Sequence, residues 1–194
     1  MSKSNIEVRV ATLQDADQIS SVLLDFYNMR NLEEAKNAFL SEMKKDFHYL
    51  VASRENSIIG IVTWLPHGLP KHGLFELDRI CILSESRGKG VGKLLVDELI
   101  KHADAWYKMM KYEKRKLYIL THENNVDAHS FYEKIGFSHE TSLKDHYYEN
   151  QNERVYSKFF EIDVLDAILS KFKINPEEKI DLNKITTISG TNKY

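Results

Sequence analysis

Glycine is unevenly distributed in this 194-residue chain, since four of its eight glycines fall in two short segments. Three of them lie in a turn at 87–93, between an apolar segment at 74–83 and a helical pattern that begins near residue 91. Glycine lets backbone N–H groups approach an anion without an intervening Cβ, and a following helix adds unpaired donors at its N-terminus. With one arginine and two lysines in the same turn, the sequence predicts a pyrophosphate site. Its residues are Arg87, Gly88, Lys89, Gly90, Val91, Gly92 and Lys93.

Two common phosphate-binding motifs do not match this turn. A P-loop requires GxxxxGK followed by Ser or Thr, but Gly92 and Lys93 are followed by Leu94. The dinucleotide fingerprint GxGxxG also fails, because the three glycines have a GxGxG spacing and come after the fourth predicted strand rather than the first. A tight surface loop with solvated lysines is the alternative that the turn alone leaves open.

Strand and helix patterns follow one another in an order typical of a mixed sheet. Alternating or continuous apolar residues predict strands, and apolar residues three and four apart predict helices. Hairpins and helical crossovers both occur, which favours an α/β fold in the order β-α-α-β-β-β-α-β-α-β-β. The predicted strands are 6–11, 47–54, 58–65, 74–83, 116–122, 137–143 and 154–162, and the predicted helices are 12–26, 32–45, 91–106 and 127–134.

A second motif lies downstream of the turn, at 125–137, where Asn125 opens a short helix that ends before Gly136-Phe137. This segment is similar to the N-xx-A-xx-(L/F)-Y pattern of the GNAT superfamily of N-acetyltransferases, and Arg87, Gly90 and Gly92 resemble that superfamily's (Q/R)xxGx(G/A) signature. The resemblance covers about residues 6–160. It implies a GNAT domain at 1–162 with a mostly antiparallel central sheet whose fourth and fifth strands splay apart. A C-terminal helical extension and a loose tail are expected at 163–194.

The resemblance implies that acetyl-CoA is the acyl donor. Backbone groups at Ile80, Cys81 and Ile82 would pair with the pantetheine arm, while Asn125 and Phe131 would contact the cofactor. Tyr132 would protonate the departing thiolate, and a phenol suits this step because thiol and phenol pKa values differ by only about two units. Each role has a purely structural alternative. The side chains at 80–82 could simply pack in the core, Asn125 could only cap a helix, and Tyr132 could be a buried structural tyrosine.

Amine attack requires a neutral nucleophile, and deprotonating a lysine-like amine at pH 7 costs roughly 4–5 kcal/mol. Glu76 is the predicted base, because it lies six residues before Ile82, where histone-type members of the superfamily carry their glutamate. Alternation places Asp78 on the same face. His67 and His72 are weaker candidates, and solvated acids at a strand edge are the alternative. Cys81 is expected to be a core residue, which favours direct transfer in a ternary complex over an acetyl-cysteine route.

The acceptor stays open at this stage. The segments 76–82 and 129–137 resemble bacterial spermidine/spermine acetyltransferases, and the acids Glu33, Glu34 and Glu42 could help to line a polycation site, or the first two could simply begin a helix. Another small amine or a protein lysine is a second possibility. Protein N-terminal acetylation is disfavoured because Leu120 stands where those enzymes carry a glutamate. A protein that binds acyl-CoA without catalysing transfer is the alternative outside the enzymes.

Composition limits which kinds of partner the protein is expected to bind and in which cellular compartment it is expected to work. A net charge of −2 provides no global field for nucleic acid, and the single cysteine indicates a reduced, cytoplasmic setting. No apolar run reaches the ~18 residues of a membrane span, and no metal is expected. The apolar helix predicted after residue 163 suits either a homodimer contact or a cover for the acceptor cleft.

Overall fold

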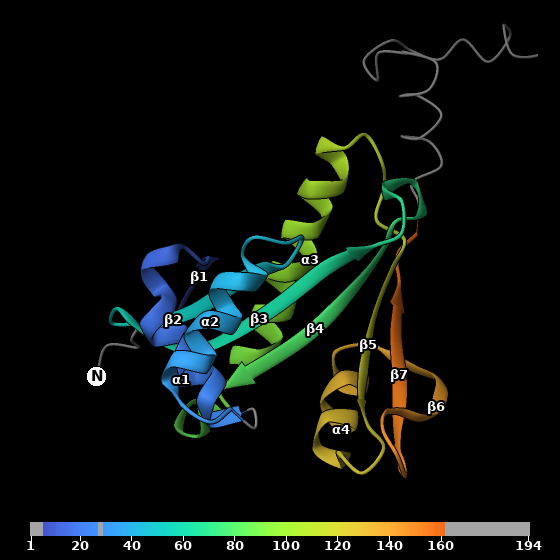
Figure 1. Cartoon of the computed structure of the whole chain (residues 1–194). Coiled ribbons are helices and arrows are strands. Elements are labelled where there is room, and N and C mark those ends of the chain that lie inside the picture. The colour runs from blue at the N-terminus through green and yellow to red at the C-terminus, as the bar shows by residue number, and fades with distance from the viewer. Residues whose placement is uncertain (1–5, 27–28, 162–194) are drawn as a thin grey trace, which may run out of the picture. The chain divides into compact units, whose positions relative to one another are not determined.

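The computed structural model describes residues 6–26 and 29–161, so the predicted extension at 163–194 lies outside the described residues. A seven-stranded sheet has the order β1-β2-β3-β4-β5-β7-β6, and only β4 and β5 run parallel (Figure 1). This order of elements confirms the predicted α/β fold. The strands are β1 (Glu7–Val10), β2 (His48–Arg54), β3 (Ser57–His67), β4 (Leu74–Ile82), β5 (Lys116–His122), β6 (Ser138–Tyr148) and β7 (Gln151–Phe159), and the α-helices are α1 (Ala16–Phe26), α2 (Leu32–Glu42), α3 (Val91–Met109) and α4 (Val126–Lys134).

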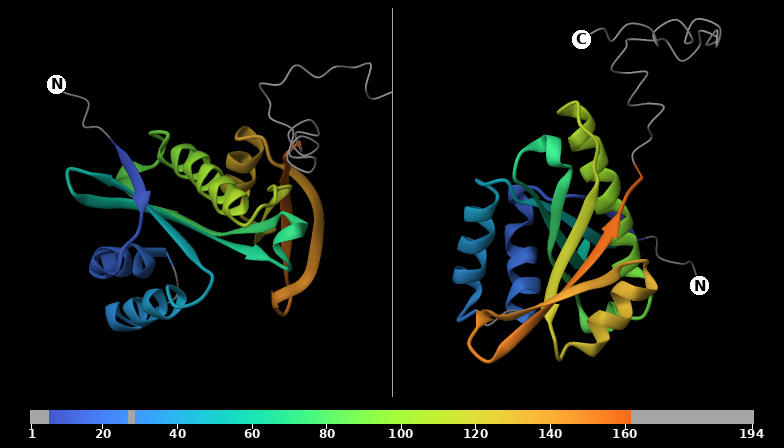
Figure 2. Two further views of the ribbon diagram at one scale, coloured as in Figure 1. Left: turned by 90° about the horizontal axis from the view of Figure 1, so that it is seen from above. Right: turned by 90° about the vertical axis from the view of Figure 1, so that its right-hand side faces the viewer.

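Two hydrophobic clusters lie on opposite faces of the sheet. One joins α1 and α2 to the sheet through residues such as Phe39, Tyr49 and Ile61. The other joins α3 and α4 to the opposite face through residues such as Trp64 and Leu99. Figure 2 shows α1 and α2 on one side of the sheet and α3 on the other. The sheet is therefore the middle layer, and β4 packs on both faces, through Leu77 on one side and Cys81 on the other.

The helices form where apolar residues recur at helical spacing. In α3 the fully buried Leu95, Leu99 and Ala103 are four residues apart, so they form one stripe against the sheet. In α2 the side chain of Asn31 accepts a hydrogen bond from Glu34 N, which caps the first turn. Within the described ranges, no helix combines the length and apolarity that crossing a membrane requires.

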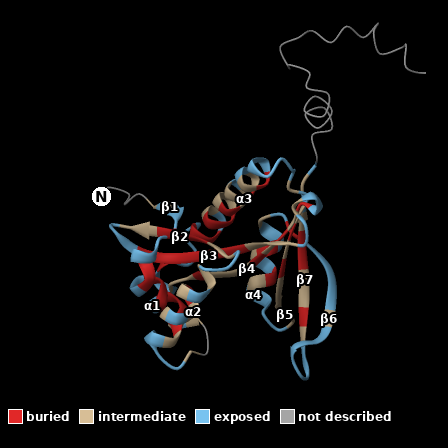
Figure 3. Ribbon diagram, turned by 45° about the horizontal axis from the view of Figure 1, so that its top comes forward, coloured by how far each residue is buried: buried red, intermediate tan, exposed pale blue. Residues whose placement is uncertain are grey.

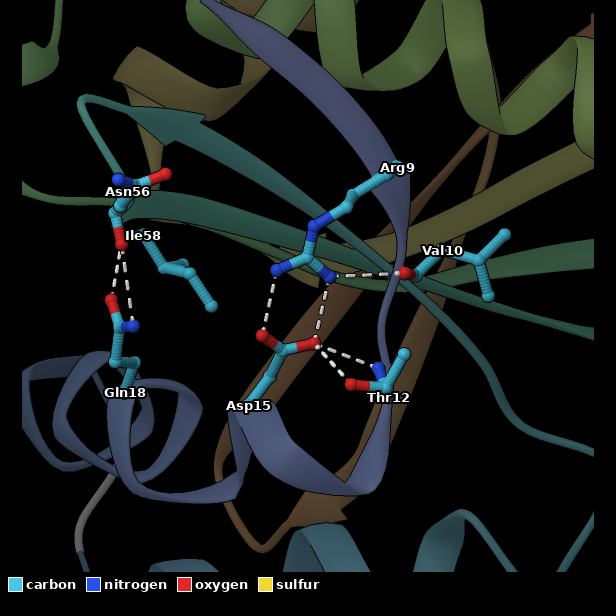
Figure 4. Close-up of polar contacts among 7 residues, drawn as sticks. All are labelled: Arg9, Val10, Thr12, Asp15, Gln18, Asn56 and Ile58. Atoms are coloured by element: carbon cyan, nitrogen blue, oxygen red, sulfur yellow. Dashed lines mark hydrogen bonds and ion pairs between the residues drawn. The ribbon is translucent and has the colours of Figure 1, made fainter.

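Polar contacts anchor β1 and the β2–β3 turn to the start of α1. Arg9 donates two hydrogen bonds to Asp15, at 2.8 and 2.7 Å, and Thr12 N donates to the same carboxylate at 2.7 Å (Figure 4). Gln18 Oε1 accepts from Ile58 N at 2.8 Å, just beyond the turn. These bonds fix the angle at which the chain leaves β1 and enters the helical layer.

Several boundaries differ from the predictions, among them the end of α3, which continues to Met109, and the end of β7, which stops at Phe159. The second helix ends at Glu42 rather than at residue 45, because Lys44 and Lys45 donate to carbonyls three residues back and tighten the last turn. The last two strands form a longer hairpin than predicted, since β6 continues to Tyr148 and β7 begins at Gln151. Polar residues fill this region, and β6 is exposed along nearly its whole length (Figure 3), so apolar alternation gives no signal there.

Candidate functional site

β4 and β5 pair over a short stretch and then separate. Their parallel pairing ends where Glu76 lies opposite Tyr118, while β4 continues to Ile82 and β5 to His122. Figure 1 shows the two strands diverging beyond this pair. The facing backbone edges of both strands are left without a strand partner, which is an arrangement that an extended ligand arm can enter by strand-like pairing. The predicted splay of the fourth and fifth strands is confirmed.

β4 contains a bulge at Asp78. Leu77 and Arg79 are both in register with residues of β3, whereas Asp78 has no register partner there and meets β3 through its side chain, which accepts a hydrogen bond from the Thr63 hydroxyl at 3.0 Å. The extra residue resets the alternation, so Leu77 and Ile80 pack against the same cluster although they are three residues apart. Cys81 then packs in the opposite cluster and is fully buried. Its thiol is a core group, as the sequence predicts.

Glu76 lies at the closed end of the opening between the strands. Its Oε2 atom is 2.6 Å from His67 Nε2 and accepts a hydrogen bond from the Tyr118 hydroxyl at 3.0 Å. Only 14% of the Glu76 side chain is exposed. Burial and the nearby Glu76 carboxylate raise the pKa of Tyr118, so this phenol stays a hydrogen-bond donor at neutral pH. Of the two histidines considered from sequence, His67 meets Glu76, whereas His72 accepts from the backbone of its own loop at 3.2 Å.

Tyr147 in β6 is influenced electrostatically by Glu76. Burial raises its pKa first, and the carboxylates of Glu76, Asp78 and Glu153 raise it further. The Tyr147 hydroxyl is thus within electrostatic range of three acids from β4 and β7. No local pattern in the sequence places this tyrosine near Glu76.

Tyr132 is buried in α4, with 4% of its surface exposed. Its ring packs beside Phe131 at 5.3 Å and Phe137 at 5.8 Å between centroids. Burial raises the pKa of Tyr132, and the Cys81 thiol contributes in the same direction. The phenol is therefore held protonated, which is the form that a proton donor needs.

The glycine turn leads directly into α3. Gly90 is the N-cap residue at φ 83°, and no side chain of the described residues caps the helix there. Gly88 also has a positive φ of 70°, and a Cβ at either glycine would meet no atom within 4 Å. The first turn of α3 consequently presents its N–H donors and dipole without a competing side chain, as an anion site requires.

The cationic side chains of the turn have local partners. Arg87 Nε donates to Ile82 O at 2.9 Å, and its guanidinium lies 4.9 Å from the centroid of the Phe26 ring. Lys89 Nζ donates to a backbone carbonyl four residues earlier at 2.6 Å, and Lys93 Nζ pairs with the aspartate one turn further along α3 at 2.5 Å. Arg87 thus ties the end of β4 to the turn, while the two lysines remain at the surface.

Gly92, Asn125 and Phe131 join the two motifs. A Cβ on Gly92 would lie 3.0 Å from both Ile82 Cδ1 and Phe131 Cζ, so glycine lets α3 approach β4 and α4 closely here. Asn125 Oδ1 accepts from Ala128 N at 3.2 Å and caps α4. The helix-cap alternative for Asn125 is therefore realised in this structure.

The acids of α2 do not gather around Glu76. Arg79 pairs with two acids at once: its Nη2 atom is 3.1 Å from Glu42 Oε1, and its Nε atom is 2.7 Å from Asp78 Oδ2. All three side chains are largely buried. Glu34 instead pairs with Arg30 at the exposed start of α2, as the alternative of an acidic first turn predicts. Sequence reasoning missed the role of Arg79, which neutralises part of the acidity near the bulge.

A second histidine–glutamate contact was also missed. His122 Nδ1 at the end of β5 is 2.6 Å from Oε1 of Glu153, which is 1% exposed in β7. His122, with Glu123, Asn124 and the hairpin turn at 150–152, lines a polar cavity of about 260 Å³. The two residues are far apart in sequence, and the only signal that could have found them is the pairing of β5 with β7.

Comparison with known proteins supports the architecture. A model of the acetyltransferase (GNAT) domain matches residues 45–139, which include β4, the glycine turn and the second motif. The chain forms a domain with the GNAT fold. This domain resembles a solved N-acetyltransferase from Staphylococcus aureus Mu50, with a TM-score of 0.65 and 20% identity over 81% of this chain and 100% of that one. It also resembles an aminoglycoside 6'-N-acetyltransferase solved with coenzyme A, with a TM-score of 0.66 and 16% identity over 79% of this chain and 96% of that one.

Among curated proteins, the GNAT domain resembles the spermine/spermidine N(1)-acetyltransferase of Bacillus subtilis strain 168. The two are 36% identical over 67 residues, which is 34% of this chain and 41% of the relative. The match therefore spans less than half of the relative's length.

Proposed function

We propose that this chain is an acetyl-CoA-dependent N-acetyltransferase that acetylates a primary alkyl amine by direct attack in a ternary complex. The observation that carries the proposal is the largely buried Glu76 carboxylate at the closed end of the opening between β4 and β5. Tyr132, a buried phenol with a raised pKa, belongs to the second GNAT motif. A proton acceptor and a proton donor are the two groups that amine acetylation requires.

The residues of the turn fit a coenzyme A pyrophosphate. The uncapped first turn of α3, open space beside Gly88 and Gly90, and the surface lysines Lys89 and Lys93 suit a multiply charged anion. The pairing of β4 with β5 stops at Glu76, and the backbone of β4 near Ile80, Cys81 and Ile82 would pair with the pantetheine arm. Asn125 and Phe131, at the start and middle of α4, complete the proposed binding site.

When bound, acetyl-CoA supplies an electrophilic thioester carbonyl. Glu76 accepts a proton from the ammonium group of the acceptor and leaves a neutral amine, which can form the new C–N bond. As the C–S bond breaks, Tyr132 gives its proton to the thiolate and later regains one from the acetylated nitrogen through solvent. Cys81 takes no part, because its thiol is buried in the core beside α1 and α2.

A polyamine is the acceptor that we favour. The Bacillus subtilis relative is a spermine/spermidine acetyltransferase, and the carboxylates of Glu76, Asp78 and Glu153 all act on Tyr147. A protein amino terminus is less suitable, since Leu120 occupies the β5 position at which we expect a glutamate in such enzymes. The pairing of Arg79 with two acids reduces the local negative charge, so the polycation site is expected to depend on Glu76 more than on Glu42.

The test is thiol release from acetyl-CoA with spermidine, monoamines, amino acids and peptides bearing lysine or a free amino terminus. Turnover with amines that falls at least ~100-fold in Tyr132→Phe or Glu76→Gln would support the roles assigned here. Saturable acetyl-CoA binding without turnover across the panel would instead favour an acyl-CoA-binding module. Absence of acetyl-CoA binding would refute the proposal.

A further inference from the structure

We infer that His67 and Tyr118 are positioning residues that hold Oε2 of Glu76 and leave Oε1 to receive the proton of the acceptor amine. This inference rests on the proposed function, because it assumes that Glu76 is the base. It assigns a task to two side chains that neither the glycine turn nor the second motif contains.

The geometry converges on one atom from two elements. His67 is the last residue of β3, and its Nε2 is 2.6 Å from Glu76 Oε2. Tyr118 belongs to β5, and its hydroxyl is 3.0 Å from the same oxygen. Among the described residues both contacts are made to Oε2, so Oε1 is the oxygen available for a further donor. An ammonium group carries three N–H donors and can supply it.

Two donors on one oxygen restrict a torsion that is otherwise soft. The terminal torsion of a glutamate has broad wells of nearly equal energy, so an unrestrained carboxylate turns either oxygen toward a ligand. With Oε2 held from both sides, rotation would break two hydrogen bonds at once. A base fixed in this way loses less orientational freedom when the amine arrives, which is a direct contribution to rate.

The state of the two donors suits this task. Burial and the adjacent carboxylate raise the pKa of Tyr118, so its hydroxyl keeps its proton at neutral pH. In the neutral tautomer with a proton on Nε2, His67 donates to Oε2 and its other nitrogen is free to face solvent, since 36% of its side chain is exposed. The rings of His67 and Tyr118 lie 5.5 Å apart, so they also support each other.

The experiment compares acetyl transfer to spermidine and to a monoamine in five variants of the full chain. Tyr118→Phe removes one donor, His67→Leu removes the other, and His67→Gln keeps an N–H near the original Nε2 position. Tyr107→Phe is the matched control, because its buried hydroxyl donates to Leu74 O at 2.7 Å, two residues from Glu76, without touching the carboxylate. Glu76→Gln tests the base itself, and thermal unfolding of each variant verifies that it is folded.

Tyr118→Phe and His67→Leu are each expected to lower kcat by ~10-fold, with the KM for acetyl-CoA unchanged, because a displaced base slows the chemical step alone. His67→Gln should retain kcat within about threefold of the parent, as should Tyr107→Phe. If Glu76→Gln lowers kcat and neither Tyr118→Phe nor His67→Leu does, the positioning role is wrong while the proposed function stands. Equal losses in His67→Gln and His67→Leu would also overturn it, since an N–H donor at this position would then not be what His67 contributes. A Glu76→Gln variant with full activity would refute the base assignment itself.

Discussion

Replacing Asp15 with asparagine is expected to destabilise the domain by about 2 kcal/mol at neutral pH. The Asp15 side chain is 7% exposed and accepts two hydrogen bonds from Arg9 and one from Thr12 N (Figure 4). Hydrogen bonding from Arg9 contributes most to lowering the pKa of Asp15 from 3.8 to about 2, and the bond from Thr12 N acts in the same direction. Each pKa unit corresponds to about 1.4 kcal/mol, so this shift alone gives about 2 kcal/mol.

The effect has a defined pH window. A carboxyl whose pKa is lower in the folded state stabilises the fold fully at pH values above its unfolded pKa, which is 3.8 for Asp15. This stabilisation is lost as the pH falls through the folded pKa of about 2. The difference in unfolding free energy between the parent and Asp15→Asn should therefore be constant from pH 7 to about 5 and should shrink toward zero near pH 2. For a chain of this size it corresponds to a Tm lower by about 4–8 °C at neutral pH.

Urea unfolding at several pH values, monitored by circular dichroism, measures this difference. Asp17→Asn is the matched control, because Asp17 lies two residues further along, in the first turn of α1, and pairs with Lys36 at 2.6 Å, but its side chain is 84% exposed. Exposed ion pairs contribute little, so the control should lose no more than about 0.5 kcal/mol. Equal losses in both variants, or a loss in Asp15→Asn that persists at pH 2, would refute the assignment to the bonds that the buried Asp15 carboxylate accepts from Arg9 and Thr12.

Three further predictions concern the region around the site. Burial lowers the pKa of His48 from 6.5 to about 4, so the neutral imidazole contributes its full share of the unfolding free energy above pH 6.5. This contribution falls by up to about 3 kcal/mol as the pH decreases toward 4. Urea unfolding between pH 4 and 7 should show that His48→Phe removes this pH dependence. Arg79→Met leaves two largely buried carboxylates without their cation and should lower the unfolding free energy by about 2–3 kcal/mol, which calorimetry can measure. Gly92→Ala forces Ile82 and Phe131 outward, so isothermal titration should show weaker acetyl-CoA binding, by ~10-fold, even though alanine favours the helix.

The sequence predicts the elements whose patterns are strong. The buried stripe of α3 and the continuous apolar run of β3 depend on residues close together in the chain, and both elements are found where they are predicted. The β6–β7 hairpin was predicted too short, because its two strands are extended by polar residues around the turn at Asn150. An exposed edge strand needs no apolar alternation, so its boundary is set by pairing with β7 instead.

The bulge in β4 explains why alternation predicts only part of the site. Strict alternation along this strand would place Leu77 and Cys81 on one face, yet the two side chains pack in opposite clusters. The extra residue, Asp78, is accommodated only because β3 pairs on both sides of it. A bulge of this kind depends on the partner strand, which is why it leaves no signal in β4 itself.

The environment of Glu76 depends on register in the same way. The resemblance to other acetyltransferases suggests a carboxylate at this position, but its hydrogen-bond donors come from residues 9 and 42 positions away. The last parallel pair of β4 and β5 joins Glu76 to Tyr118, so one register determines both where the strands part and which side chain meets the carboxylate. A slip of one residue would turn an apolar neighbour toward Glu76 and remove the donor. The fold that separates β4 from β5 is therefore also what orients the proposed base, and a change at the β4–β5 pairing should alter the proposed cofactor binding and catalysis together.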